Sequence, residues 1–169
     1  MFHDADSALK WAAKIKCTLI IDGSSVNDMC GKPRQSTTNE LLMGLSPQEA
    51  QQQADMIIRY ASSIHDPICA QYLQAKYFFM NKIDDIVHQV LAGLLHAIGG
   101  TNRRDIRLVV ESYLGSRVTR RQMRQSLRCR ASDVVRVERD VYRVMDKVHY
   151  RAINEIESKF ADVGLVRYG

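Results

Sequence analysis

One stretch of this chain is dominated by arginine. Between Arg117 and Arg130 the sequence contains six arginines and no acidic residue. The guanidinium group is planar and always charged, and it can bind a phosphate or a guanine through two parallel hydrogen bonds. Six such groups without a neighbouring carboxylate predict a surface that binds a polyanion, and nucleic acid is the polyanion that this pattern favours.

The net charge of +5 conceals a difference between two parts of the chain. Residues 1–100 contain 8 basic and 10 acidic side chains, whereas residues 101–169 contain 16 basic and 9 acidic side chains. Fourteen of those 16 are arginines. A basic part beside a nearly neutral part is typical of a nucleic-acid-binding protein, and a solvated helix face is the alternative interpretation.

Two amphipathic segments meet at a short turn within this basic region. We expect Thr119 to cap a short helix over residues 120–126, and Ser132 to cap the helix that follows. The residues expected to point inward are Met123, Leu127, Cys129, Val134, Val137 and Val141. This pattern predicts a helix-turn-helix at about residues 119–141, whose second helix would enter the major groove of DNA.

The outward residues of this motif divide into two groups by their expected contacts. Arg121, Arg130, Arg136 and Arg139 are placed to approach bases, and Arg136 and Ser132 would face base edges directly. The other arginines lie where backbone phosphates pass, so they would give affinity and register. The predicted DNA-binding residues are Arg120, Arg121, Arg124, Arg128, Arg130, Ser132, Val135, Arg136 and Arg139.

Two of these positions depart from the usual helix-turn-helix pattern. Arg124 stands where a small residue normally lets the helices approach, which predicts a wider crossing angle or a side chain that extends to solvent. Arg128 stands where the turn normally has glycine, which predicts an arginine in the left-handed backbone conformation. A helical hairpin that serves only as a packing unit is the alternative.

The rest of the sequence predicts an all-α protein, a compact helical domain with this C-terminal motif and a long final helix. A first helix should begin at Asp4 or Asp6, and residues 17–22 should follow it as a strand or an extended tail. Capping and helix-stop signals predict further helices over residues 46–62, 66–79, 81–98 and 103–114. We expect residues 1–45 to form a helix and loop, a candidate partner-binding arm, and residues 46–169 to form the helical DNA-binding domain.

The final helix is expected to continue far beyond the motif. Its apolar period runs from Ser132 to Phe160, and its later half alternates in charge as an exposed face would. The apolar stripe needs a partner, which is either the core of the domain or a second copy of the chain. A homodimer is therefore the alternative to a monomer.

Little else in the sequence could do chemistry. His65 and Cys69 are four residues apart and Asp84 neighbours Asp85, but no paired-ligand motif or further carboxylate cluster accompanies them. Neither a phosphate-binding glycine loop nor a nucleophile elbow is present. We expect no metal, no cofactor and no enzymatic activity. Scattered cysteines and the lack of a secretory or membrane-spanning pattern predict a cytoplasmic protein without membrane contact.

The stretches RRDIRLVVESYLG and VTRRQMRQSLRCRASDVVRVERDVYRVMDKV resemble the C-terminal DNA-binding region of bacterial sigma factors. Over about residues 101–150 the layout is similar to the late-gene antiterminators of phages, called Q. The resemblance implies a transcription regulator in the bacterial host cell, with double-stranded DNA, RNA polymerase and the sigma factor as partners. It implies that Arg121, Ser132, Arg136 and their neighbours bind a DNA element, and that the loop at 23–45 contacts polymerase. Some members contain a zinc-binding insertion that this chain lacks.

The sequence is also compatible with three alternatives to this function. The first is an operator-binding dimeric repressor or activator without polymerase contact. The second is a DNA-packaging protein of the small-terminase type that uses the same motif to hold DNA. The third is a metal-dependent nuclease, for which Asp84 and Asp85 would be the starting point.

Overall fold

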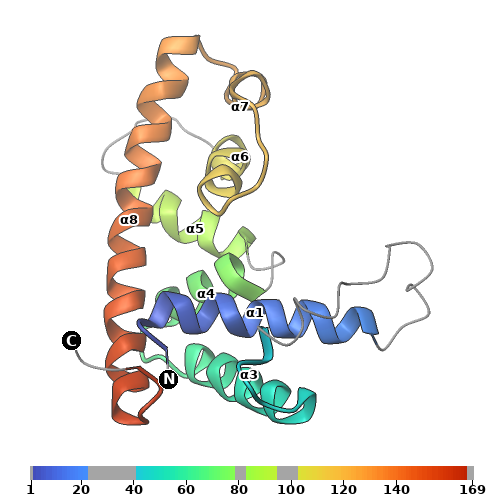
Figure 1. Ribbon diagram of the computed structural model, residues 1–169. Coiled ribbons are helices and arrows are strands. Elements are labelled where there is room, and N and C mark those ends of the chain that lie inside the picture. The colour runs from blue at the N-terminus through green and yellow to red at the C-terminus, as the bar shows by residue number, and fades with distance from the viewer. Residues whose placement is uncertain (1, 23–40, 79–82, 95–102, 167–169) are drawn as a thin grey trace. The chain divides into compact units, whose positions relative to one another are not determined.

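The protein is all-α, as its sequence predicts. The computed structural model describes residues 2–22, 41–78, 83–94 and 103–166 (Figure 1). Its helices are α1 (Ala5–Asp22), α3 (Pro47–Ser62), α4 (Pro67–Leu73), the π-helical η2 (Gln74–Phe78), α5 (Ile83–Leu94), α6 (Arg103–Tyr113), α7 (Arg120–Leu127) and α8 (Ala131–Asp162). The described residues form no strand, only an isolated bridge between Phe2 and Val166. None of the described helices has the length and apolar character needed to cross a membrane.

Local capping signals set where several helices begin. The Ser46 hydroxyl accepts a hydrogen bond from the Glu49 backbone N–H, while the Glu49 carboxylate accepts one from the Ser46 N–H. The Asp66 carboxylate accepts a hydrogen bond from the Ile68 N–H at 2.9 Å, and proline follows both caps. The predicted helix starts at residues 46 and 66 are therefore confirmed, because these side chains satisfy N–H groups that the helix itself leaves unpaired. Asp4 is confirmed as the cap of α1, since its carboxylate accepts from the Ser7 N–H at 2.7 Å.

Two segments differ from the prediction. Residues 17–22 continue α1, so the expectation of a strand or extended tail is wrong. No glycine or proline interrupts the chain before Gly23, and an established helix adds further residues at little cost. The helix predicted over 66–79 changes to π-helix at Gln74, a rare widening that the apolar period does not signal. Residues 23–40 of the loop predicted over residues 23–45 lie outside the described residues, as does the glycine stop at 99–100.

The chain divides into two units, which we describe separately. The first contains residues 1–63 and 155–169, and the second contains residues 64–154, so the boundary falls inside α8. The predicted division at residue 45, which concerns partner binding, stays a prediction.

In the first unit α1 packs against α3, and the last turns of α8 complete the core. The apolar face of α1 is fully buried, and its members are Ala8, Leu9, Trp11, Ala12 and Ile15. The Trp11 Nε1–H donates a hydrogen bond to the Leu41 carbonyl at 2.7 Å. Tyr60 of α3 meets Phe160 of α8 edge to face, with ring centroids 6.5 Å apart.

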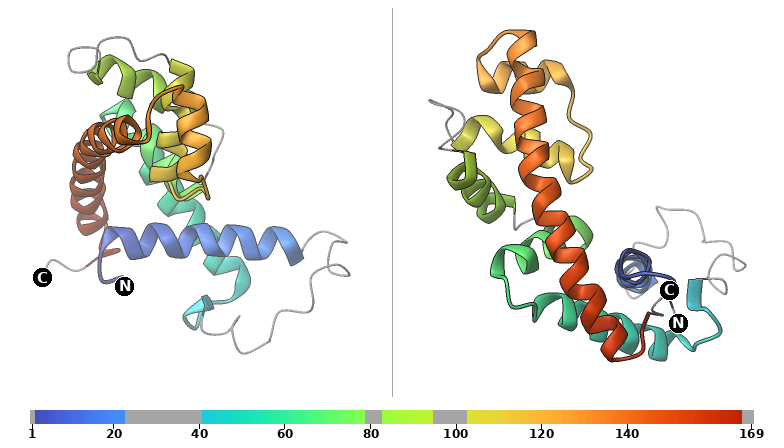
Figure 2. Two further views of the ribbon diagram at one scale, coloured as in Figure 1. Left: turned by 90° about the horizontal axis from the view of Figure 1, so that it is seen from above. Right: turned by 90° about the vertical axis from the view of Figure 1, so that its left-hand side faces the viewer.

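In the second unit polar contacts hold α6 beside α8. The Tyr113 hydroxyl donates a hydrogen bond to the Asp146 carboxylate at 2.7 Å, and the Ser112 and Tyr142 hydroxyls lie 3.2 Å apart. Burial, reinforced by the Asp146 carboxylate, raises the pKa of Tyr113, so its hydroxyl remains a donor at neutral pH. Seen from above in Figure 2, α6 and α7 lie on the same side of α8. These contacts orient the start of α8, where the arginines gather.

Candidate nucleic-acid interface

The short helix α7 begins with a capping box. The Thr119 hydroxyl accepts a hydrogen bond from the Gln122 N–H at 3.3 Å, and the Gln122 amide oxygen accepts one from the Thr119 N–H at 2.8 Å. The prediction that Thr119 caps this helix is confirmed. Sequence reasoning missed Gln122, although threonine followed three residues later by glutamine is the signature of such a box.

The turn between α7 and α8 depends on one left-handed residue. Arg128 has φ 49° and ψ 36°, so the predicted left-handed arginine is confirmed. This conformation ends α7 and redirects the chain toward α8 within three residues. An arginine there is strained by about 1–2 kcal/mol relative to glycine, because its Cβ approaches the backbone. The protein therefore has a basic side chain at a position where glycine would be more stable.

The predicted cap of α8 is wrong by two residues. The helix begins at Ala131, and the Arg130 carbonyl accepts its first hydrogen bonds, from the N–H groups of Asp133 and Val134. Arg130 therefore occupies the capping position, and Ser132 lies exposed in the first turn of the helix. Ser132 does not cap the helix, and it lies on the surface predicted to meet DNA.

The inward pattern of the motif is confirmed at its strongest positions. Met123, Val134, Val137 and Val141 are buried. Leu127 and Cys129 are only half-buried, so the expectation of a buried cysteine in the turn is wrong. Burial, together with the Asp133 carboxylate nearby, still raises the pKa of the Cys129 thiol. The thiol therefore stays protonated at neutral pH and packs as a small apolar group.

The outward pattern is confirmed as well. Like Ala131, the predicted DNA-binding residues just before α8 and in its first turns are all exposed: Arg130, Ser132, Val135, Arg136 and Arg139. From Ala131 onward their spacing puts them on one side of the helix. Val135 is 49% exposed, which is unusual for an apolar side chain on a packed helix. The start of α8 thus presents hydroxyl, methyl and guanidinium groups together.

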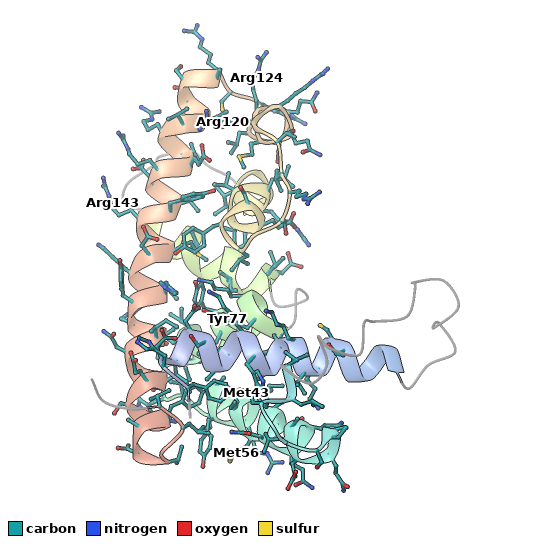
Figure 3. All side chains as sticks on the ribbon, in the orientation of Figure 1. Met43, Met56, Tyr77, Arg120, Arg124 and Arg143 are labelled. Carbon is teal, nitrogen blue, oxygen red and sulfur yellow. The ribbon has the colours of Figure 1, made fainter. Side chains whose placement is uncertain are left out.

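The arginines of α7 border the same surface. Arg120, Arg121 and Arg124 line a hollow of about 450 Å³ together with Ala131, Val134 and Val135 of α8. Figure 1 shows α7 nearly end-on beside the start of α8, so the two helices cross steeply. Arg124 is exposed, which agrees with the predicted side chain that extends to solvent. Figure 3 labels Arg120 and Arg124 at this end of the unit.

Few of these positive charges are neutralised within the protein. Arg120 lies 3.7 Å from the Glu138 carboxylate, and Arg136 lies 4.0 Å from Asp133, which is a weak contact. Among the described residues no carboxylate pairs with Arg121, Arg124, Arg128, Arg130 or Arg139. The first turn of α7 contains no acidic residue, so its arginines also oppose the positive end of the helix dipole. A bound anion would reduce both the repulsion among the arginines and their repulsion by the helix dipole.

Comparison with known protein families and with curated proteins finds no match for this chain.

The described residues contain no group of three histidine, cysteine or acidic side chains arranged to hold a metal ion. Of the two residues considered as zinc ligands, His65 is exposed to solvent and Cys69 is buried.

Replacing Arg128 by glycine separates the stability of the turn from its predicted phosphate contact. We expect Arg128→Gly to raise the free energy of unfolding by about 1 kcal/mol, because glycine adopts the left-handed conformation without strain. We also expect weaker binding to duplex DNA, because one positive charge is lost. Urea denaturation and fluorescence anisotropy measure the two effects, and a variant that is more stable and binds DNA as wild type would contradict a phosphate contact at Arg128.

Proposed function

We propose that this protein is a transcription regulator that binds double-stranded DNA through α7 and the start of α8 and acts on RNA polymerase. The observation that carries the DNA-binding part is the exposed face of α8 from Ala131 to Arg139, bordered by Arg121 and Arg124, with which no described carboxylate pairs. The major groove of DNA is wide enough to admit one α-helix, so the first turns of α8 could place this face against the base edges.

The proposed contacts follow from the chemistry of each side chain. Arg136 can donate two hydrogen bonds to guanine, and Ser132 can bind either a donor or an acceptor on a base edge. The exposed methyl groups of Val135 suit the methyl group of thymine. Arg121, Arg130 and Arg139 flank these residues, while Arg120, Arg124 and Arg128 bind phosphates on the walls of the groove.

We expect the double variant Arg121→Ala, Arg136→Ala to lose on the order of 100-fold in affinity for a specific site, since one base contact and one flanking contact disappear. Fluorescence anisotropy with a duplex that the wild-type protein selects from a random library measures this loss. The matched control is Lys14→Ala, Arg59→Ala, which removes the same charge from exposed positions of the first unit. A double variant that retains specific binding would contradict the proposed interface.

The action on RNA polymerase is supported by a different observation. The sequence from Arg103 to Val148 resembles the DNA-binding region of sigma factors, which works in contact with polymerase. In this chain α6 precedes the reading pair and is tied to α8 through Tyr113 and Asp146, so the resembling stretch forms one connected set of helices. The remaining helices, in the nearly neutral part of the chain, offer surface for a protein partner. Late-gene antitermination is the form of regulation that the resemblance favours.

Footprinting on promoter DNA with and without RNA polymerase tests this second part. We expect the protected region near the promoter to change in extent when polymerase is added, because the two proteins would occupy the DNA together. An operator-binding repressor or activator without polymerase contact predicts the same protected region in both cases, or simple competition. That result would remove the polymerase claim and leave the DNA-binding claim intact.

A further inference from the structure

The exposed face of α8 does not end with the motif. Beyond Arg136, basic side chains recur at Arg139, Arg143 and Lys147, at intervals of three and four residues. All of these side chains are exposed; Arg139 belongs to the proposed reading face, and we call Arg143, Lys147 and the following Tyr150 the α8 stripe. Intervals of three and four place residues on one side of a helix, so the stripe continues the face predicted to read DNA.

The packing of α8 fixes the direction of this stripe. Val137, Val141, Met145 and Val148 are buried in the second unit, and the α8 stripe lies on the opposite side of the helix. Figure 3 shows Arg143 projecting from α8 on the side away from α6 and α7. Tyr150 is 67% exposed, which is more than any other large hydrophobic residue among those that the structure describes.

The neighbouring acidic residues leave the stripe positive. The carboxylate of Asp146 accepts a hydrogen bond from the Tyr113 hydroxyl of α6. Asp140 is half-buried, and Arg151, the next basic residue, lies 3.4 Å from Asp66, which caps α4. Among the described residues no carboxylate pairs with Arg139, Arg143 or Lys147. The charge of the stripe is therefore available to a partner.

We propose that the α8 stripe binds the phosphate backbone of the same DNA duplex, beyond the groove that the start of α8 enters. Lys147 follows Arg136 by eleven positions, which is about 16 Å along a helix. The major groove is about 12 Å wide, so a helix whose first turns meet base edges brings its later turns to the backbone. Arginine, lysine and tyrosine all bind phosphate oxygens there. This inference rests on the proposed DNA binding and enlarges its contact area.

The salt dependence of binding tests the stripe, because each phosphate contact contributes about 0.9 to the slope of log affinity against log salt. The probe is a labelled mixed-sequence duplex of about 30 base pairs, titrated by anisotropy between about 50 and 200 mM salt. We expect Arg143→Ala, Lys147→Ala to reduce the slope by about 1.8, so that the loss of affinity over this range is roughly tenfold smaller than in wild type. Arg143→Lys, Lys147→Arg preserves both charges and should keep the wild-type slope.

The controls distinguish failure of this inference from failure of the proposed function. Lys14→Ala, Arg59→Ala removes the same net charge elsewhere and should leave the slope unchanged. If Arg121→Ala, Arg136→Ala lowers the slope while Arg143→Ala, Lys147→Ala does not, the stripe does not bind duplex phosphates although the motif does. A stripe variant that loses affinity only for single-stranded RNA also overturns the inference. If the wild-type protein does not bind the duplex, both proposals fall.

Discussion

The burial of one side of α8 is the constraint on which the rest of the structure depends. The helix runs unbroken over 32 residues, and its apolar side chains recur every three or four residues from Val134 to Phe160. Each of the two units buries its own part of this row of apolar side chains. Since a helix has a fixed turn per residue, burying one side determines which residues face solvent along its whole length. The exposure of Ser132, Arg136 and Arg143 is thus a consequence of the core.

The turn before α8 shows how stability is exchanged for charge. Arg128 adopts a backbone conformation that glycine would adopt more easily, and Thr119 and Gln122 cap α7 with two reciprocal hydrogen bonds. The capping box offsets part of the strain, because such a cap contributes roughly 1 kcal/mol. Strained residues are frequent where function requires a particular side chain, and the strain at Arg128 is consistent with a role beyond folding.

Much of this fold could be predicted from the sequence, for identifiable reasons. Ser46, Asp66 and Thr119 predict where their helices begin, because a cap depends only on residues close in the sequence. The apolar period of α8 is long enough to predict a helix without ambiguity. The left-handed Arg128 was also predictable, since the motif demands that conformation whatever the residue.

The failures have physical reasons too. The π-helical turn at Gln74–Phe78 and the contact of Tyr113 with Asp146 arise from tertiary packing, which leaves no period in the sequence. Serine favours the capping position, so the sequence predicts Ser132 as the cap, whereas the turn geometry gives that position to Arg130. The predicted site residues on α8 all lie on its exposed side. Their contacts with DNA remain a prediction, because exposure and charge show which chemical groups are available and not which molecule binds them.

Photo-crosslinking from Val135 tests the central claim most directly. Val135 is 49% exposed at the centre of the proposed reading face, and Val163, which is 44% exposed in the first unit, is a matched control. When each is replaced in turn by p-benzoyl-phenylalanine and irradiated with duplex DNA, we predict crosslinking at position 135 and little at position 163. Equal crosslinking at both positions, or crosslinking at 163 alone, would contradict the account.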